Sequence, residues 1–484
     1  MTISSLYKGG AYMNDKMKLF KNDIKNKKIA VIGLGISNKA LIKYLHKIGV
    51  KNITGFDMVN EDSSRKIIRY FEDEGIFIQY EFGNDYLKRL ANDFFDYIFK
   101  TPVIRFDIPE LVEARIKGTI VTSEMEIFME LCPAKNIAVT GSDGKTTTTT
   151  LIYKMLVEQG YKTWLGGNIG RPLINDIELI MPEDKVVLEL SSFQLQTMSV
   201  SPDIAVITNV SPNHLDIHKS YDEYINAKTN IFMYQNSVLG NFVVLNYDNC
   251  ETRNFANITP VAYRLFSRVN ELDRGAFVRG KMLVYRDSFK ITEIVNEDEI
   301  LLPGKHNVEN CLAAISAIID IVEPAIIRKV VKSFGGVEHR LELVRTFEGV
   351  KYYNSSIDSS PSRTIAALQV FKNKIILIAG GKDKCILYDE MGSYILDKVK
   401  VLILIGETSD KIEYALMNEV KRRGIDNPVC LIRCDTYKEV VEAARGIAKN
   451  GDCVLLSPAS TSFDMFKNFE DRGKTFKKIV NELQ

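Results

Sequence analysis

A glycine-rich segment with one lysine and two threonines carries the clearest chemistry in the sequence. It lies between the apolar run 137–140 and a threonine-rich stretch that begins a helix. Backbone amides in such a loop can surround a phosphate, the lysine can reach the β- and γ-phosphates, and the first threonine can bind Mg²⁺. The residues of this candidate nucleotide site are Gly141, Ser142, Asp143, Gly144, Lys145, Thr146 and Thr147.

The spacing of this loop departs from the standard Walker pattern, because Val139 stands where a glycine would be expected. A glycine-rich turn with a surface lysine is the alternative interpretation. The place of Gly-Lys-Thr between a strand and a helix start favours the nucleotide site.

Two further polar residues end neighbouring apolar strands. Glu189 lies at the end of the run 186–190, where a carboxylate without a partner is unfavourable. His214 follows the run 204–208. A divalent cation would compensate the carboxylate, and both strand ends could reach one ion. A solvated glutamate and a structural histidine are the alternatives.

A second glycine pair lies near the N-terminus. Gly33 and Gly35 follow the strand 29–32, and Asp57 follows a second strand about twenty residues later. Such glycines let the backbone approach a phosphate at a helix N-terminus, and the carboxylate could accept from a ribose or from a uracil N–H. Asn38 replaces the third glycine of the dinucleotide motif, so a tight strand-to-helix turn is nearly as good an interpretation.

These candidate residues depend on short β-branched runs that alternate with amphipathic helices. Continuous apolar strands of this kind are typical of parallel sheets covered on both faces, so we expect an α/β fold. The clearest predicted strands are 29–33, 96–100, 137–141, 186–190, 204–208, 375–381, 401–406 and 453–458.

Composition limits the class of protein. The 484 residues predict about three domains. A net charge of +1 argues against nucleic-acid binding, and no apolar run approaches the roughly 18 residues of a membrane span. Seven cysteines without paired spacing indicate reduced thiols, so we expect a cytoplasmic protein.

The pattern along the chain predicts four segments. Residues 1–23 form a polar extension to which we assign no fold, and α/β domains follow at 24–122, 123–336 and 337–484. Alternating segments between 261 and 301 predict a small antiparallel insert in the middle domain.

Several segments occur in the order found in the Mur ligases, and the sequence resembles this family from about residue 27 to the C-terminus. They are TGSDGKTT, ELSSFQL, TNVSPNHLDIH, GKHNVEN, GVEHRLE and LLSPASTSFDMFKNFEDRG. SSFQL and SFDMFKNFEDRG resemble the members that add D-glutamate to UDP-N-acetylmuramoyl-L-alanine. The resemblance therefore implies an ATP-dependent ligase of peptidoglycan synthesis. It also implies a Rossmann-like UDP-substrate domain, a central P-loop-type ATPase domain and a Rossmann-like amino-acid-binding domain.

The resemblance assigns roles residue by residue. The phosphate-binding residues above would hold ATP together with Arg340. The expected catalytic residues are Lys145, His214, Lys228 and Arg340. His306, Asn307 and Asn310 would lie on the adenine side. The expected UDP-substrate residues are Gly35, Ser37, Asn38, Asp57, Thr101, Asn168 and His214.

The resemblance also implies two Mg²⁺ ions and a modified lysine. Thr146, Glu189 and His214 would serve the metal sites. Lys228 looks by composition like an ordinary helix lysine, but it matches the family lysine that takes up CO₂. The resulting carbamate is anionic, as a metal ligand must be, whereas an ammonium is not.

The D-glutamate side departs from the family pattern. Ser462, Phe463 and Phe469 match the expected binding positions, and we expect Ser359 as a further neutral donor, but Ile357 replaces the usual lysine. We expect a compensating cation from Lys382, Lys384 or Arg363. Lys382 is the first choice, because Gly380-Gly381 ends a buried strand and would direct the next side chain into a cleft.

Other departures are Ser355, in place of the usual ribose-side aspartate, and Val103, in place of a glycine. Two other hypotheses stay open: a different amide ligase, such as one acting on folates, and an inactive nucleotide-binding homologue. For the ligase we expect an acyl-phosphate intermediate, closure of the last domain, and a monomer.

Overall fold

The computed structural model describes residues 13–213, 217–302, 304–383 and 386–484. The chain divides between Ser333 and Phe334 into two compact units, which are described separately. All the strands that the sequence most clearly predicts are present. Among the described residues, no helix has both the length and the apolar character needed to cross a membrane.

The first unit begins with a five-stranded parallel sheet in the order β3-β2-β1-β4-β5. Its central strand is almost wholly buried, as the continuous apolar run predicts. Its elements are β1 (Lys28–Ile32), α3 (Ile36–Lys47), β2 (Asn52–Asp57), α4 (Glu61–Glu72), β3 (Gln79–Phe82), α5 (Lys88–Asn92), β4 (Tyr97–Lys100), α6 (Pro109–Ile116), β5 (Ile120–Thr122) and α7 (Glu124–Leu131).

A nine-stranded sheet follows in the same unit, in the order β14-β13-β12-β11-β10-β9-β6-β8-β7. Its first half contains β6 (Lys135–Thr140), α8 (Lys145–Glu158), β7 (Thr163–Gly167), η1 (Ile174–Leu179), β8 (Lys185–Glu189), α9 (Ser192–Leu195), β9 (Ile204–Ile207), α10 (Tyr221–Met233), η2 (Ser237–Leu239) and β10 (Phe242–Asn246). Its second half contains α11 (Cys250–Asn254), η3 (Phe255–Asn257), β11 (Ala262–Ser267), β12 (Gly275–Arg279), β13 (Met282–Arg286), β14 (Ile291–Asn296), η4 (Glu297–Glu299), α12 (Lys305–Ile318) and α13 (Pro324–Ser333).

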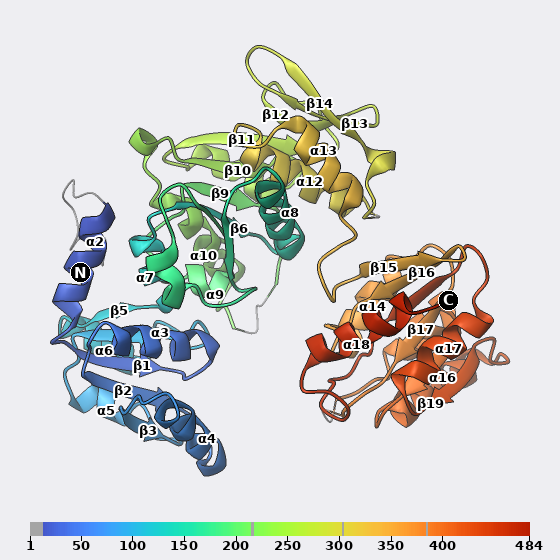
Figure 1. The fold of residues 1–484 in the computed structure, drawn as a ribbon, viewed down its shortest axis with the longest axis horizontal. Coiled ribbons are helices and arrows are strands. Elements are labelled where there is room, and N and C mark those ends of the chain that lie inside the picture. The colour runs from blue at the N-terminus through green and yellow to red at the C-terminus, as the bar shows by residue number, and fades with distance from the viewer. Residues whose placement is uncertain (1–12, 214–216, 303, 384–385) are drawn as a thin grey trace. The chain divides into compact units, whose positions relative to one another are not determined.

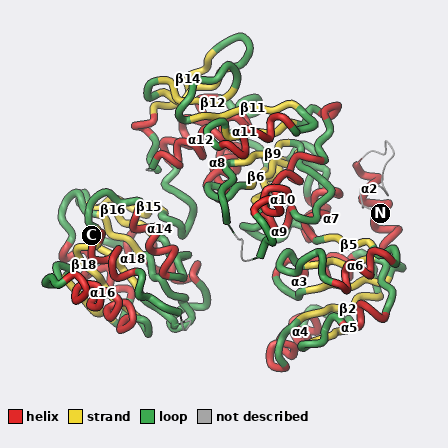
Figure 2. Tube along the Cα trace, turned by 180° about the vertical axis from the view of Figure 1, so that it is seen from behind, coloured by secondary structure: helices red, strands yellow, loops and turns green. Residues whose placement is uncertain are grey.

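The segment 261–301 is only partly an antiparallel insert. Strands β12, β13 and β14 pair antiparallel at the edge of the sheet, whereas β11 pairs parallel with β10. Figure 2 shows this edge extending from the central layer. The prediction was therefore wrong for β11, because a short alternating run does not reveal which neighbour it pairs with.

The second unit is a six-stranded sheet in the order β15-β16-β20-β17-β18-β19, parallel except for β15 and β16. Apolar side chains of β17 and β18 alternate between two cores, so helices cover both faces (Figure 1). Its elements are β15 (Glu342–Phe347), β16 (Val350–Asn354), α14 (Pro361–Gln369), β17 (Ile375–Ala379), α15 (Met391–Lys398), β18 (Val399–Ile405), α16 (Ser409–Arg423), β19 (Cys430–Cys434), α17 (Tyr437–Ile447), β20 (Cys453–Leu456) and α18 (Phe469–Asn481).

Part of the predicted N-terminal extension forms a helix, α2 (Met13–Ile24). Phe20 and Ile24, four residues apart on one helix face, are fully buried. Lys16 pairs with Glu130 of α7, and Lys21 pairs with Glu178 of η1. The polar extension, to which we assigned no fold, therefore contains a helix, because the overall polarity of the segment hides one apolar face.

Candidate functional site

A tight loop joins β6 to α8, and we call residues 141–147 the phosphate loop. Gly144 precedes the helix with φ +77°, a backbone conformation that favours glycine. A Cβ atom at Gly141 would overlap the hydroxyl of Thr208, and one at Gly144 would overlap the side-chain oxygen of Asn310. The loop can therefore follow this path only with glycine at both positions.

The ammonium group of Lys145 is folded back into the phosphate loop. Its Nζ donates to the carbonyl oxygens of Gly141 at 2.9 Å and Ser142 at 2.8 Å. Thr146 is buried in the first turn of α8, and Thr147 is half-buried. The positive charge thus lies at a helix N-terminus, where an anion would be stabilised.

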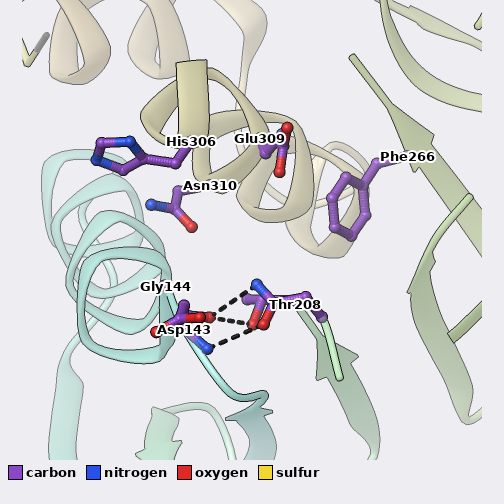
Figure 3. Close-up of a pocket in the computed structure, with 8 residues that line it drawn as sticks. Asp143, Gly144, Thr208, Phe266, His306, Glu309 and Asn310 are labelled. Carbon is purple, nitrogen blue, oxygen red and sulfur yellow. Dashed lines mark hydrogen bonds between the residues drawn. The ribbon is translucent and has the colours of Figure 1, made fainter. Parts of the chain in front are cut away.

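A cavity of about 330 Å³ opens beside the phosphate loop (Figure 3). His306 and Asn310 of α12, which the resemblance assigns to the adenine side, form one side of it. Asn307 is buried next to them, and its side-chain oxygen accepts from Asn310 at 3.1 Å. The residues lining the cavity are Asp143, Gly144, Thr208, Asn209, Phe266, His306, Glu309 and Asn310.

Thr208, Asn209, Phe266 and Glu309 were not singled out from the sequence. Thr208 and Asn209 follow β9, and both side chains bond to the backbone of Asp143. Their place after a predicted buried strand was a usable signal. Phe266 and Glu309 gave none, because only the packing of α12 beside β11 brings them to the cavity.

Glu189 is buried at the end of β8, beside the phosphate-loop strand, with only 1% of its surface exposed. One carboxylate oxygen accepts from the side-chain amide of Asn168 at 2.7 Å. The other is buried and has no hydrogen-bond partner among the residues that the structure describes. Such an oxygen is unfavourable unless a ligand completes it, so the residue fits a Mg²⁺ site.

Lys228 is a buried lysine, also 1% exposed, on α10. Its Nζ donates to the Gly141 carbonyl at 2.8 Å and lies 4.6 Å from the ring centroid of Tyr224. Burial, and secondly the charge of Lys145, hold the pKa of this amine well below its ordinary value, against the opposite effect of Asp143. Lys145 and Lys228 therefore share one carbonyl acceptor, and the second amine is easily deprotonated.

The third predicted metal residue, His214, lies outside the described residues. Within the part of the chain that the structure describes, no group of three or more His, Cys, Asp or Glu side chains is arranged to hold a metal ion. The chemistry of the remaining donors still fits such an ion: Glu189 has an open oxygen, and Lys228 would become an oxygen donor on carbamylation.

The predicted UDP-substrate residues of the first sheet gather at the carboxyl ends of β1, β2 and β4. Asn38 is buried and donates to the carbonyls of Ile32 and Gly33, at 2.9 and 2.8 Å. One oxygen of Asp57 accepts from the Leu34 amide at 2.6 Å. These two side chains hold the loop itself.

Other groups at the same sheet edge are more accessible. Gly35 is exposed and Ser37 is half-buried at the N-terminus of α3, and Thr101, half-buried after β4, packs against Gly33. Asn168 is not part of this loop, because it bonds to Glu189 in the central sheet. The structure therefore groups Gly35, Ser37 and Thr101, and places Asn168 beside Glu189, the candidate metal ligand.

In the second unit, Lys382 is exposed and its Nζ pairs with Glu407 at 2.6 Å. Its backbone amide donates to the Thr461 carbonyl at 2.9 Å, so Lys382 is adjacent to Ser462, which is buried. Ser359 is half-buried and Phe463 is mostly exposed.

The two other candidate cations contribute differently. Arg363 is exposed, and its guanidinium donates to the Ile357 carbonyl at 3.1 Å. Lys384 lies outside the described residues. Of the two candidates that the structure describes, Lys382 pairs through its backbone with Thr461, the residue before Ser462.

Arg340 is exposed, but its neighbour His339 is buried with φ +63°. The His339 ring bonds to Asn354 and packs edge-on against Phe469, with centroids 6.0 Å apart. Burial lowers the pKa of His339. His339 therefore fixes the position of the loop that carries the adjacent Arg340.

Arg472 is a buried arginine that the sequence reading did not single out. It donates to the hydroxyl of Ser356 at 3.0 Å, to the Ser356 carbonyl at 2.8 Å and to the Ser460 carbonyl at 3.0 Å. It therefore ties the altered loop around Ile357 to the segment around Ser462. Its position in SFDMFKNFEDRG was the available signal.

Comparison with known proteins defines the class. Residues 139–318 match the Mur ligase middle domain, and residues 339–460 match the Mur ligase, glutamate ligase domain. The chain belongs to the Mur ligase family and is an enzyme of the ligase class.

The chain is similar to two relatives called UDP-N-acetylmuramoylalanine--D-glutamate ligase, from Ruminiclostridium cellulolyticum and Acetivibrio thermocellus. It is 55% identical to each, and both alignments cover 98% of this chain and 100% of the relative. Its fold is similar to that of UDP-N-acetylmuramate-alanine ligase from Thermotoga maritima, with a TM-score of 0.53 at 17% identity, over 94% of this chain and 99% of the other.

Proposed function

We propose that the protein joins D-glutamate to UDP-N-acetylmuramoyl-L-alanine at the expense of ATP, in peptidoglycan precursor synthesis. The observation that carries the proposal is the convergence of Lys145, Lys228 and Glu189 around the phosphate loop. The choice of D-glutamate is supported by the 55% identity to the two ligases over their whole length.

In this proposal, residues 141–147 bind the phosphates of ATP. His306, Asn307 and Asn310 hold the adenine side, and Arg340 is the arginine that the family resemblance assigns to ATP. The cavity between the loop and α12 supports this assignment, because it has a phosphate-binding loop at one side and polar amides at the other.

Lys228 is assigned as a carbamylated lysine. A carbamate forms when a neutral amine attacks CO₂, a nitrogen–carbon bond forms and a proton is released. The lowered pKa of the buried amine favours the neutral form that this reaction needs. Thr146, Glu189, His214 and carbamylated Lys228 would then hold two Mg²⁺ ions, which supply charge neutralisation for phosphoryl transfer.

The reaction needs no protein nucleophile. A carboxylate oxygen of the L-alanyl group bonds to the γ-phosphorus as ADP leaves, which gives an acyl phosphate. The amine of D-glutamate then attacks the acyl carbon, phosphate leaves from the tetrahedral intermediate, and the nitrogen loses a proton. Lys145 and Arg340 orient the phosphates and neutralise their charge.

The substrates are assigned to separate regions. Residues 24–122 form the UDP-substrate domain, 123–336 the ATP domain and 337–484 the amino-acid domain of a monomer. The UDP-substrate residues are Gly35, Ser37, Asn38, Asp57, Thr101, Asn168 and His214. The D-glutamate residues are Ser359, Lys382, Ser462, Phe463 and Phe469.

Phosphate release tests the proposal directly. The protein is mixed with ATP, Mg²⁺ and UDP-N-acetylmuramoyl-L-alanine, with and without D-glutamate. We expect sustained release only when all components are present. Release that depends on another amino acid would indicate a different amide ligase, and no release from the folded protein would indicate an inactive nucleotide-binding homologue.

A further inference from the structure

Arg105 lies on the loop that follows β4, four residues after Thr101. Its guanidinium makes a two-pronged ion pair with Asp107 on the same loop, with Nε at 2.8 Å and Nη2 at 3.0 Å. Nothing in the assignments above uses this side chain.

The same guanidinium also contacts α10 and the segment before it, in the part of the first unit that contains the nine-stranded sheet. Its Nη1 donates to the Ile217 carbonyl at 2.7 Å, and its Nη2 donates to a Glu223 oxygen at 2.7 Å. Glu223 lies in the first turn of α10, and its carboxylate also accepts from Gln196 at 2.6 Å. We call Arg105, Asp107, Gln196, Lys219 and Glu223 the Arg105 cluster; Lys219 completes it by pairing with Asp107.

The Arg105 cluster is stronger than an ordinary surface ion pair. The side chains of Arg105 and Glu223 are only 22% and 20% exposed, so water screens their charges incompletely. Hydrogen bonds from Arg105 and then Lys219 lower the pKa of Asp107, while those to Asp107 and then Glu223 raise the pKa of Arg105. Charge-assisted pairs with planar, two-pronged geometry also fix orientation.

Both ends of the cluster are rigidly connected to candidate site residues. On one side, the buried Lys100 donates to the Ile104 carbonyl at 3.0 Å, which fixes the loop between Thr101 and Arg105. On the other, Glu223 lies five residues before Lys228 on the same helix. A displacement of the first turn of α10 is therefore transmitted to the Lys228 amine.

We propose that Arg105 is a positioning residue that couples the UDP-substrate loop to the helix carrying Lys228. The proposal rests on the proposed function for the identity of the substrate. When the nucleotide-sugar substrate fixes the loop that carries Thr101 and Arg105, the contact between Arg105 and Glu223 would hold α10 in the position that places Lys228 beside the phosphate loop.

Steady-state kinetics of Arg105→Ala tests this coupling. Loss of a charge-assisted contact typically changes an equilibrium by at least about tenfold, so kcat should fall about tenfold and KM for UDP-N-acetylmuramoyl-L-alanine should rise, with KM for ATP unchanged. Arg105→Lys should recover part of kcat. Arg89→Ala is the matched control, because Arg89 on α5 pairs with Glu81 of β3 and with Asp93, away from α10, and should leave all three constants unchanged.

Hydrogen exchange separates this proposal from the proposed function. Without any substrate, amides in 217–224 should exchange faster in Arg105→Ala than in the wild type, and should be unchanged in Arg89→Ala. Unchanged exchange there overturns the coupling, whether or not the wild type is a ligase. Wild-type kcat and KM in Arg105→Ala, or losses fully explained by a smaller folded fraction, overturn it as well.

Discussion

Glu189, beside the phosphate loop, is buried and has one carboxylate oxygen without a partner among the described residues, whereas Lys382 of the second unit is exposed and already paired with Glu407. The first residue is unfavourable as it stands and is stabilised when a ligand arrives. The second loses a partner when an anion binds. A ligand at the first region would therefore relieve an unfavourable buried charge, whereas an anion at the second would have to displace an existing ion pair.

This difference extends to the neighbouring lysines. Lys145 and Lys228 converge on one carbonyl, where burial leaves little water to screen added charge. The Lys382–Glu407 pair lies in solvent, where such interactions are weak. We therefore expect large effects from changes around the phosphate loop and small effects around Lys382.

The largest effect is expected for Lys145→Ala. Removing the only phosphate-loop side chain that can neutralise the γ-phosphate should lower ligation by more than about 10³-fold. Phosphate release measures this, and Lys154→Ala, an exposed lysine on the same helix, is the matched control. Near-normal turnover of correctly folded Lys145→Ala protein would refute the phosphate-loop assignment.

Lys228→Ala should lower kcat about 100-fold, because it removes the anionic group proposed to hold the metal. Acetate should restore part of the activity by filling the vacated space. Lys228→Arg, which cannot form a carbamate and leaves no space, should stay inactive with acetate. The idea fails if Lys228→Ala is fully active, or if mass spectrometry of the native, metal-loaded protein finds no carbamate.

Lys382→Ala should raise KM for D-glutamate about tenfold and leave KM for ATP nearly unchanged, because one charge-assisted hydrogen bond is lost. Lys384→Ala and Arg363→Ala are measured alongside. If none of the three variants changes KM for D-glutamate, the compensating-cation hypothesis is wrong, and backbone amides and hydroxyls hold the amino acid.

The smallest effect, of opposite sign, is expected for Glu407→Gln. Removing the charge that competes for Lys382 should lower KM for D-glutamate about two- to fivefold, the range of an exposed ion pair. An increase would mean that Glu407 itself contributes to the site. Glu407→Gln combined with Lys382→Ala should behave like Lys382→Ala alone.

The sequence predicted the parts of the molecule that depend on local pattern. The buried strands and the glycine-dependent phosphate loop were visible because their residues are contiguous. The burial of Lys228 was not visible in periodicity and came only from the resemblance, since its depth depends on how α10 packs against the sheet. Arg472 was missed because its partners, Ser356 and Ser460, lie 116 and 12 residues away in the sequence and meet it only in the folded chain.

Some roles assigned by resemblance acquired a different structural setting. Asn38 and Asp57 were expected to bind the UDP substrate, but their side chains bond to the strand-to-helix loop itself. Asn168 bonds to Glu189. Residue identity and spacing indicate which side chains approach one another. They do not indicate which hydrogen-bonding groups are already used within the protein.

The helix α2 has a consequence for the order in which the chain is completed during synthesis. Its residues leave the ribosome before their partners, because Glu178 follows Lys21 by 157 residues and Glu130 follows Lys16 by 114. At about 5–20 residues per second, the longer interval lasts roughly 8–30 s. During that time α2 lacks its ion-pair partners on α7 and η1, so a segment made early is secured only after η1 has been synthesised.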